Sequence, residues 1–108
     1  MTESEFNQRV DDIIESIEDK LDEVDADLDY ETAGGILTIS FENNTKVILN
    51  RQTPLKQIWV ATKSGGFHFN YNTEVDAWIK DDDGTELLTA LKQYCTDQAG
   101  ETVDLLAG

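Results

Sequence analysis

The sequence predicts an α+β fold, a two-layer α-β sandwich whose N- and C-terminal helices pack on one face of a five- to six-stranded antiparallel sheet. Both ends of the chain carry apolar residues at helical spacing on a single stripe. The segment between them consists of short strand-like runs joined by hairpin-length turns, which make antiparallel pairs because a parallel crossover needs about a dozen residues or more. A length of 108 residues suits one core, so residues 1–108 are predicted to form a single domain.

The first helix is predicted over residues 3–24 and carries an acidic outer face. Thr2 and Glu5 form a capping-box pattern at its start. The apolar stripe consists of Phe6, Val10, Ile13, Ile14, Ile17, Leu21 and Val24. The opposite arc holds seven acids, Asp11, Asp12, Glu15, Glu18, Asp19, Asp22 and Glu23. The helix is therefore predicted to bury one side and to present carboxylates on the other.

After Val24 the period changes to two. Asp25, Asp27, Asp29 and Glu31 alternate with Ala26, Leu28 and Tyr30. Alternation is typical of a strand, with one set of side chains on each face. We therefore expect the strand acids to continue the acidic helix face as one anionic ridge.

Turn residues divide the rest of the chain into strands and a second helix. Gly34-Gly35, Asn43-Asn44, Pro54, Ser64-Gly65-Gly66 and Asp81–Gly84 separate strands predicted over 36–41, 46–50, 57–62, 67–71 and 77–79. Thr85 is predicted to cap a helix that runs to Ala99 and ends at Gly100. The tail over 102–106 is expected to pack across the helices.

Composition excludes several classes of function. A net charge of −15 argues against nucleic acid and against anionic membrane surfaces as partners. No apolar run approaches the roughly 20 residues that span a bilayer, and the N-terminus lacks the features of a signal peptide. The single cysteine, Cys95, provides no disulfide framework, which favours the cytoplasm.

The acidic ridge is the strongest functional signal. Eleven carboxylates lie between Asp11 and Glu31 with one basic residue, Lys20, among them. Like charges at i,i+3 and i,i+4 repel by a few tenths of a kcal/mol per pair. A solvated or salt-adapted surface is one interpretation, and a site for metal cations or a basic protein is the other. Oxygen ligands without imidazole or thiolate predict weak, poorly selective binding of hard divalent ions.

Enzyme chemistry finds little support in the sequence. His68 is the one histidine and lies in a predicted strand, where a surface or neighbour-paired role is expected. Cys95 falls on the core side of the second helix, and no phosphate loop, catalytic triad or Cys/His cluster is present. The chain is expected not to be an enzyme.

Trp59, which alternates with Ile58 and Val60, is predicted to face the open side of the sheet as a contact anchor or as part of a local cluster.

The segment from Asn50 to Ala61, Asn-Arg-Gln-Thr-Pro-Leu-Lys-Gln-Ile-Trp-Val-Ala, followed by Gly65-Gly66, resembles the signature of the frataxin family. The acid-studded first helix before Gly35-Ile36-Leu37-Thr38-Ile39 is similar as well, and the short chain resembles the bacterial members. The resemblance implies weak binding of iron (Fe²⁺ or Fe³⁺), which other divalent cations can replace. It implies metal ligands at Glu18, Asp19, Asp22, Glu23, Asp25, Asp27, Asp29 and Glu31. It implies partner contacts by the same ridge and by Asn50, Gln52, Gln57 and Trp59.

The resemblance also implies a role in iron–sulfur cluster assembly, with the cysteine desulfurase and the scaffold protein as partners. The chain is expected to be a monomer, with an iron-dependent oligomer as a further state. Asn7 stands where bacterial members often place a histidine, which leaves the carboxylates nearly alone as ligands. The leading hypothesis is a non-enzymatic iron-binding accessory or regulator. The alternatives are a ferroxidase and an acidic binding module without a metal role.

Overall fold

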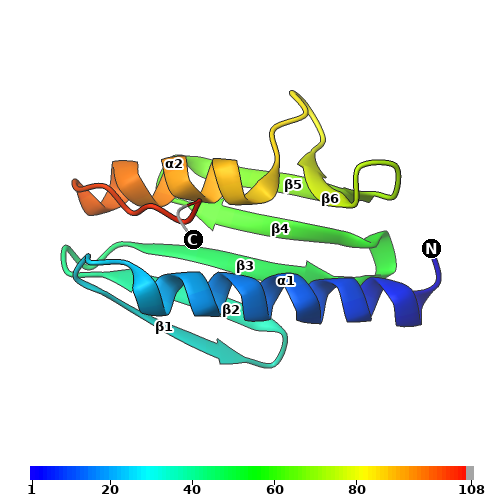
Figure 1. The fold of residues 1–108 in the computed structure, drawn as a ribbon, viewed down its shortest axis with the longest axis horizontal. Helices are drawn as coiled ribbons and strands as arrows, with labels where there is room; N and C mark the ends of the chain where they lie inside the picture. The colour runs from blue at the N-terminus through cyan, green and yellow to red at the C-terminus, as the bar shows by residue number, and fades with distance from the viewer. Residues whose placement is uncertain (107–108) are drawn as a thin grey trace.

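The computed structural model describes residues 1–106 and confirms the predicted α+β sandwich (Figure 1). The elements in chain order are α1 (Glu3–Glu23), β1 (Leu28–Ala33), β2 (Ile36–Phe41), β3 (Lys46–Gln52), a 3₁₀ turn η1 (Thr53–Leu55), β4 (Gln57–Thr62), β5 (Gly65–Asn72), β6 (Ala77–Lys80) and α2 (Leu87–Ala99). The capping box of Thr2 and Glu5 is present at the start of α1, and Gly100 ends α2 with a left-handed backbone at φ 72°. No helix among residues 1–106 is long and apolar enough to cross a membrane.

The six strands form one antiparallel sheet in the order β1-β2-β3-β4-β5-β6, so that each strand pairs with its neighbour in the sequence. The register places residues of different strands in rows across the sheet. Asn50 lies opposite Trp59, and Trp59 lies opposite His68. A second row runs from Glu31 through Thr38, Ile48 and Ala61 to Gly66. These rows determine which side chains meet on the face of the sheet that the helices leave open.

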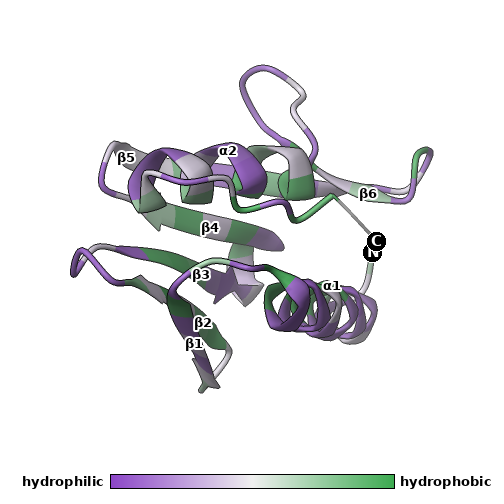
Figure 2. Cartoon of the chain, turned by 60° about the vertical axis from the view of Figure 1, so that its left-hand side comes forward, coloured by the Kyte–Doolittle hydropathy of each residue, from purple (hydrophilic) through white to green (hydrophobic). Residues whose placement is uncertain are grey.

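Both helices cover the same face of the sheet, and the core lies between the two layers (Figures 1 and 2). The apolar stripe of α1 is buried, and Phe6 meets Trp78 of β6 edge to face at 5.7 Å between ring centroids. The tail after α2 runs back between the helices, where Val103 and Leu105 are fully buried. Cys95 is buried too, and burial raises the pKa of its thiol to about 12, which fits a core residue rather than a nucleophile.

Two sequence predictions about boundaries were wrong. The N-cap of α2 is Glu86 and not Thr85, because the Glu86 carboxylate accepts hydrogen bonds from the N–H groups of Leu88 and Thr89. Thr85 instead pairs its carbonyl with the Lys80 N–H and donates its own N–H and hydroxyl to Asp83. Strand β1 begins at Leu28, so Asp25 and Asp27 lie in the connection that precedes it.

Candidate metal and partner surface

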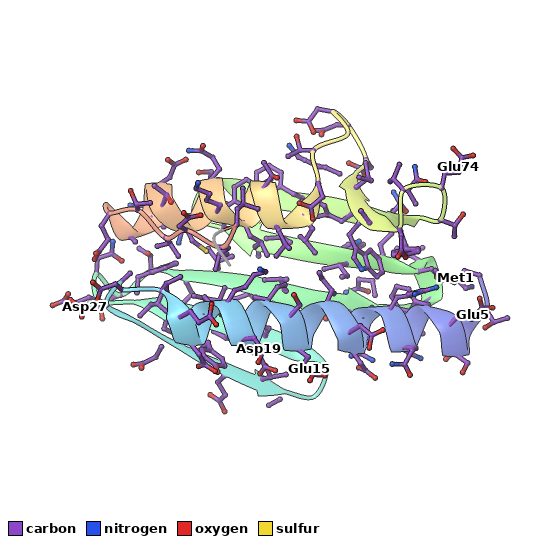
Figure 3. All side chains as sticks on the ribbon, viewed as in Figure 1. Met1, Glu5, Glu15, Asp19, Asp27 and Glu74 are labelled. Carbon is purple, nitrogen blue, oxygen red and sulfur yellow. The ribbon has the colours of Figure 1, made fainter. Side chains whose placement is uncertain are left out.

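The acids of α1 project from the edge of the helix that lies over β1. The buried stripe holds the opposite side of the helix against the sheet, which leaves Glu15, Asp19, Asp22 and Glu23 exposed and Glu18 half-buried. Figure 3 shows Glu15 and Asp19 pointing outward from this edge. The amphipathic pattern of α1 therefore gathers like charges that repel one another over two turns.

Two of these helix acids are hydrogen-bonded to β1. The Tyr30 hydroxyl donates to Asp22 Oδ1 at 2.6 Å, and the Thr32 hydroxyl donates to Glu18 Oε2 at 2.8 Å. The bond to the Asp22 carboxylate raises the pKa of Tyr30 to about 12. Glu18 and Asp22 thus hold the edge strand to the helix, a role that the residue pattern alone does not indicate.

The strand acids lie on the other face of β1, so the prediction of one continuous ridge was wrong. Tyr30 and Thr32 face α1, and alternation therefore turns Asp29 and Glu31 toward the open face of the sheet. Both are exposed. The carboxylates consequently occupy both sides of the edge strand instead of a single surface.

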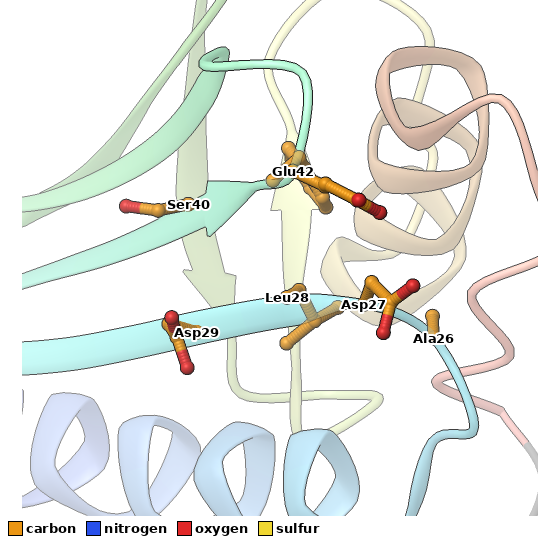
Figure 4. A pocket seen from close by; sticks show the side chains of 7 residues that line it. Ala26, Asp27, Leu28, Asp29, Ser40 and Glu42 are labelled. Carbon is orange, nitrogen blue, oxygen red and sulfur yellow. The ribbon is translucent and has the colours of Figure 1, made fainter.

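Asp27 and Asp29 line a shallow hollow at the end of the β1-β2 pair, together with Ser40 and Glu42 (Figure 4). Asp29 lies opposite Ser40 in the register. The Asp27 and Glu42 side chains lie near each other at one end, and Asp29 lies farther along β1. Glu42 was not predicted as a site residue, although its place directly after the strand over 36–41 would have put it beside the acidic segment.

Few cations approach these acids. Among residues 1–106 the Lys and Arg ion pairs join Arg9 to Asp76, Arg51 to Asp11, Lys80 to Asp82 and Asp83, and Lys92 to Asp104. None of these pairs includes one of the eight predicted metal ligands. The carboxylates on both sides of β1 therefore keep their negative charge, which attracts cations and basic protein surfaces.

The predicted ligands do not form an assembled metal centre. In the part of the chain that the structure describes, no three Asp, Glu, His or Cys side chains are grouped closely enough to hold an ion. Exposed oxygen donors on separate elements suit hard cations, and each ion would keep much of its water shell. This geometry fits weak cation binding with open coordination.

The predicted partner residues lie on the open face, and Trp59 is fixed in place there. Its indole N–H donates to Gln57 Oε1 at 2.8 Å, and its ring stacks on His68 with centroids 4.5 Å apart. Gln57 in turn donates to Asn70 at 3.2 Å. Ile58 and Val60 point into the core, which confirms the predicted orientation of Trp59. Trp59 belongs to a local cluster and is half-buried, and its role as a contact anchor stays a prediction.

Asn50 and Gln52 complete this neutral surface. Asn50 lies opposite Trp59, Gln52 lies opposite Gln57, and both are half-buried. Arg51 points to the helix layer between them, where it donates to Asn7 at 3.2 Å and to Asp11 at 2.5 Å. Asn7, which stands where the resemblance leads one to expect a histidine, thus acts as an acceptor for Arg51.

Comparisons with known proteins agree with this geometry. A family model described as a frataxin-like domain matches residues 1–101. The iron-sulfur cluster assembly protein CyaY of Vibrio cholerae is 48% identical over 105 residues, which cover 96% of this chain and 98% of that protein. CyaY of Paraburkholderia phymatum is 45% identical over 106 residues, which cover 97% and 98%.

Solved structures show the same fold. The frataxin of Psychromonas ingrahamii, a CyaY family protein, superimposes with a TM-score of 0.90 at 46% identity and covers 99% of this chain and 100% of its own. Trimeric frataxin from the yeast Saccharomyces cerevisiae, complexed with ferrous iron, has a TM-score of 0.71 at 26% identity and covers 86% and 87%.

Proposed function

The chain belongs to the frataxin family, and on this basis we propose that it is a non-enzymatic, iron-binding accessory protein of iron–sulfur cluster assembly in the cytoplasm. It binds iron weakly and docks on the complex of the cysteine desulfurase with its scaffold protein. The observation that carries the proposal is the set of exposed carboxylates on both sides of β1, none of which has a Lys or Arg partner among residues 1–106.

Weak iron binding follows from the chemistry of these donors. Carboxylate oxygens bind Fe²⁺ and Fe³⁺ without needing a preformed cage, and Mn²⁺ or Co²⁺ are expected to substitute. Binding at Asp22 or Glu18 competes with the hydrogen bonds from Tyr30 and Thr32, which lowers affinity further. The yeast frataxin solved with ferrous iron supports iron as the physiological cation.

Docking combines two surfaces. The acidic helix edge supplies long-range attraction to a basic protein, which raises the association rate and makes binding sensitive to salt. The neutral open face supplies the contact itself, with Trp59 held in position before the partner arrives.

A bound iron ion reduces the negative charge of the acidic helix edge, so that iron weakens the electrostatic part of docking. This coupling offers a physical route to iron sensing.

Titration calorimetry with Fe²⁺ under anaerobic conditions, and with Co²⁺ in air, tests the metal role. Asp19→Asn combined with Glu23→Gln should weaken cation binding severalfold. Glu74→Gln removes one charge from the exposed β5–β6 turn and serves as the control that leaves binding unchanged. Unaltered binding in the Asp19/Glu23 variant would remove the metal role and favour an acidic binding module.

A pull-down with the desulfurase–scaffold complex at several salt concentrations tests the docking role. Trp59→Ala should lose binding at all salt concentrations, and Asp19→Asn should lose it chiefly at low salt. Measurement of oxygen consumption in the presence of Fe²⁺ distinguishes a ferroxidase from a non-enzymatic accessory protein. Multiple turnovers that disappear in the Asp19/Glu23 variant would identify an enzyme.

A further inference from the structure

A small apolar hollow adjoins Trp59 on the open face of the sheet. It has a volume of about 170 Å³ and is lined by residues of β3, β4 and β5, namely Ile48, Asn50, Trp59, Val60, Ala61, Gly66, Phe67 and His68. An engineered apolar cavity of about 150 Å³ holds one benzene molecule. The hollow therefore has room for one side chain of moderate size.

The hollow exists because two small residues face each other across β4 and β5. Ala61 lies opposite Gly66 in the register. A Cβ atom added at Gly66 would meet no heavy atom within 4 Å. The backbone of Gly66 lies outside the left-handed region, so a larger residue could occupy this position without strain.

The aromatic wall of the hollow is rigid. Trp59 is fixed by the hydrogen bond to Gln57 and by the stack with His68, whose Nδ1 lies 3.7 Å from Asp81 Oδ2. Little side-chain freedom remains to be lost when the hollow is filled. This arrangement suits an anchor residue of a partner.

The row of residues that contains the hollow ends on a carboxylate. From Gly66 and Ala61 the row continues through Ile48 and Thr38, which carry no charge, to Glu31 on the edge strand. Glu31 has no Lys or Arg ion pair among residues 1–106. Strands β4 and β1 are three spacings apart, about 14 Å, which an extended chain covers in roughly four residues.

We propose that the hollow receives a single aliphatic side chain of the partner, and that a Lys or Arg roughly four residues away in the same extended segment reaches Glu31. The inference rests on the proposed function, because it specifies the chemistry of the segment that docks on this face. The neutral row between the two ends matches an uncharged stretch in the partner segment.

The affinity of variants for the desulfurase–scaffold complex of Vibrio cholerae, measured by surface plasmon resonance, tests this proposal. Gly66→Leu fills the hollow and should raise Kd on the order of tenfold to a hundredfold, the loss expected when one aliphatic side chain is no longer buried. Gly66→Ala fills it partly and should have a smaller effect. Ala61→Leu fills the hollow from β4 and provides the measurement if Gly66→Leu does not fold.

The charged end of the segment has its own matched pair of variants. Glu31→Gln and Asp29→Asn remove the same charge from the same face of the same strand, but only Glu31 belongs to the row of the hollow. Glu31→Gln should weaken binding several times more than Asp29→Asn. Equal effects of the two variants would overturn the proposed path of the segment.

Failure of this inference differs from failure of the proposed function. Wild-type affinity in Gly66→Leu and Ala61→Leu, with binding lost in Trp59→Ala, would refute the aliphatic anchor and leave the docking role intact. Wild-type affinity in the Trp59→Ala variant as well would refute docking on this face altogether.

Discussion

Replacing Asp19 by Asn should stabilise the protein at low salt, because Asp19 lies among like charges without a basic partner. Glu15, Asp22 and Glu23 lie three or four residues from Asp19 on the same side of α1. Each such pair costs about 0.2–0.5 kcal/mol. Relief of three pairs amounts to about 1 kcal/mol, whereas Asp and Asn differ little in helix propensity.

Urea unfolding at low and at high salt measures this effect. The free energy of unfolding of Asp19→Asn should exceed that of the wild type by about 1 kcal/mol at low salt, and the gain should disappear near 1 M salt, where the Debye length is about 3 Å. Asp11→Asn is the control on the same helix. The Asp11 carboxylate is paired with Arg51 at 2.5 Å, so the Asp11→Asn variant should have a lower free energy of unfolding than the wild type. A stability loss in Asp19→Asn, or a gain that persists at high salt, would refute the idea that α1 is strained by its own charges.

Three other predictions follow from the structure. Tyr30→Phe should lower stability through the lost hydrogen bond to Asp22. Because the folded-state pKa of about 12 lies above the ordinary value of 10.0, this loss should be complete below pH 10 and fade as pH rises through 12, as unfolding followed over that range would show. Millimolar Mn²⁺ or Co²⁺ should raise the melting temperature in calorimetry, since a ligand that prefers the folded state stabilises it, and the rise should be smaller in Asp19→Asn. Gly100→Ala should destabilise by about 1 kcal/mol in urea unfolding, because the C-cap requires a positive φ of 72°, whereas Gly66→Ala should be nearly neutral.

The fold could be predicted from the sequence because each element carries its own local signal. The stripe from Phe6 to Leu21 marks α1, and the turn residues at Gly34-Gly35 and Asn44 adopt the positive φ values that such turns require. The cap of α2 was misplaced because Asp83 satisfies Thr85, which leaves the cap to Glu86. Competition between neighbouring polar groups depends on geometry that residue types alone do not give.

The sequence predicted which residues make up the candidate site, but it did not predict how they are arranged in space. Alternation indicated which residues of β1 share a face, but it did not indicate which face lies under α1. The hydrogen bonds from Tyr30 and Thr32 to the helix acids answer that question, and they place Asp29 and Glu31 on the opposite side. The stack of His68 on Trp59 likewise depends on the register of β4 and β5, which no motif encodes.

The sequential strand order has a consequence for how the chain folds. Every strand pairs with its immediate neighbour in the sequence, so the sheet can grow one hairpin at a time without closing a long loop. The contact of longest range between the two ends of the chain is that of Phe6 in α1 with Trp78 in β6, and we expect it to form after the hairpins. β1 is an edge strand of the finished sheet, and its exposed carboxylates Asp29 and Glu31 help to keep that edge from pairing with another molecule.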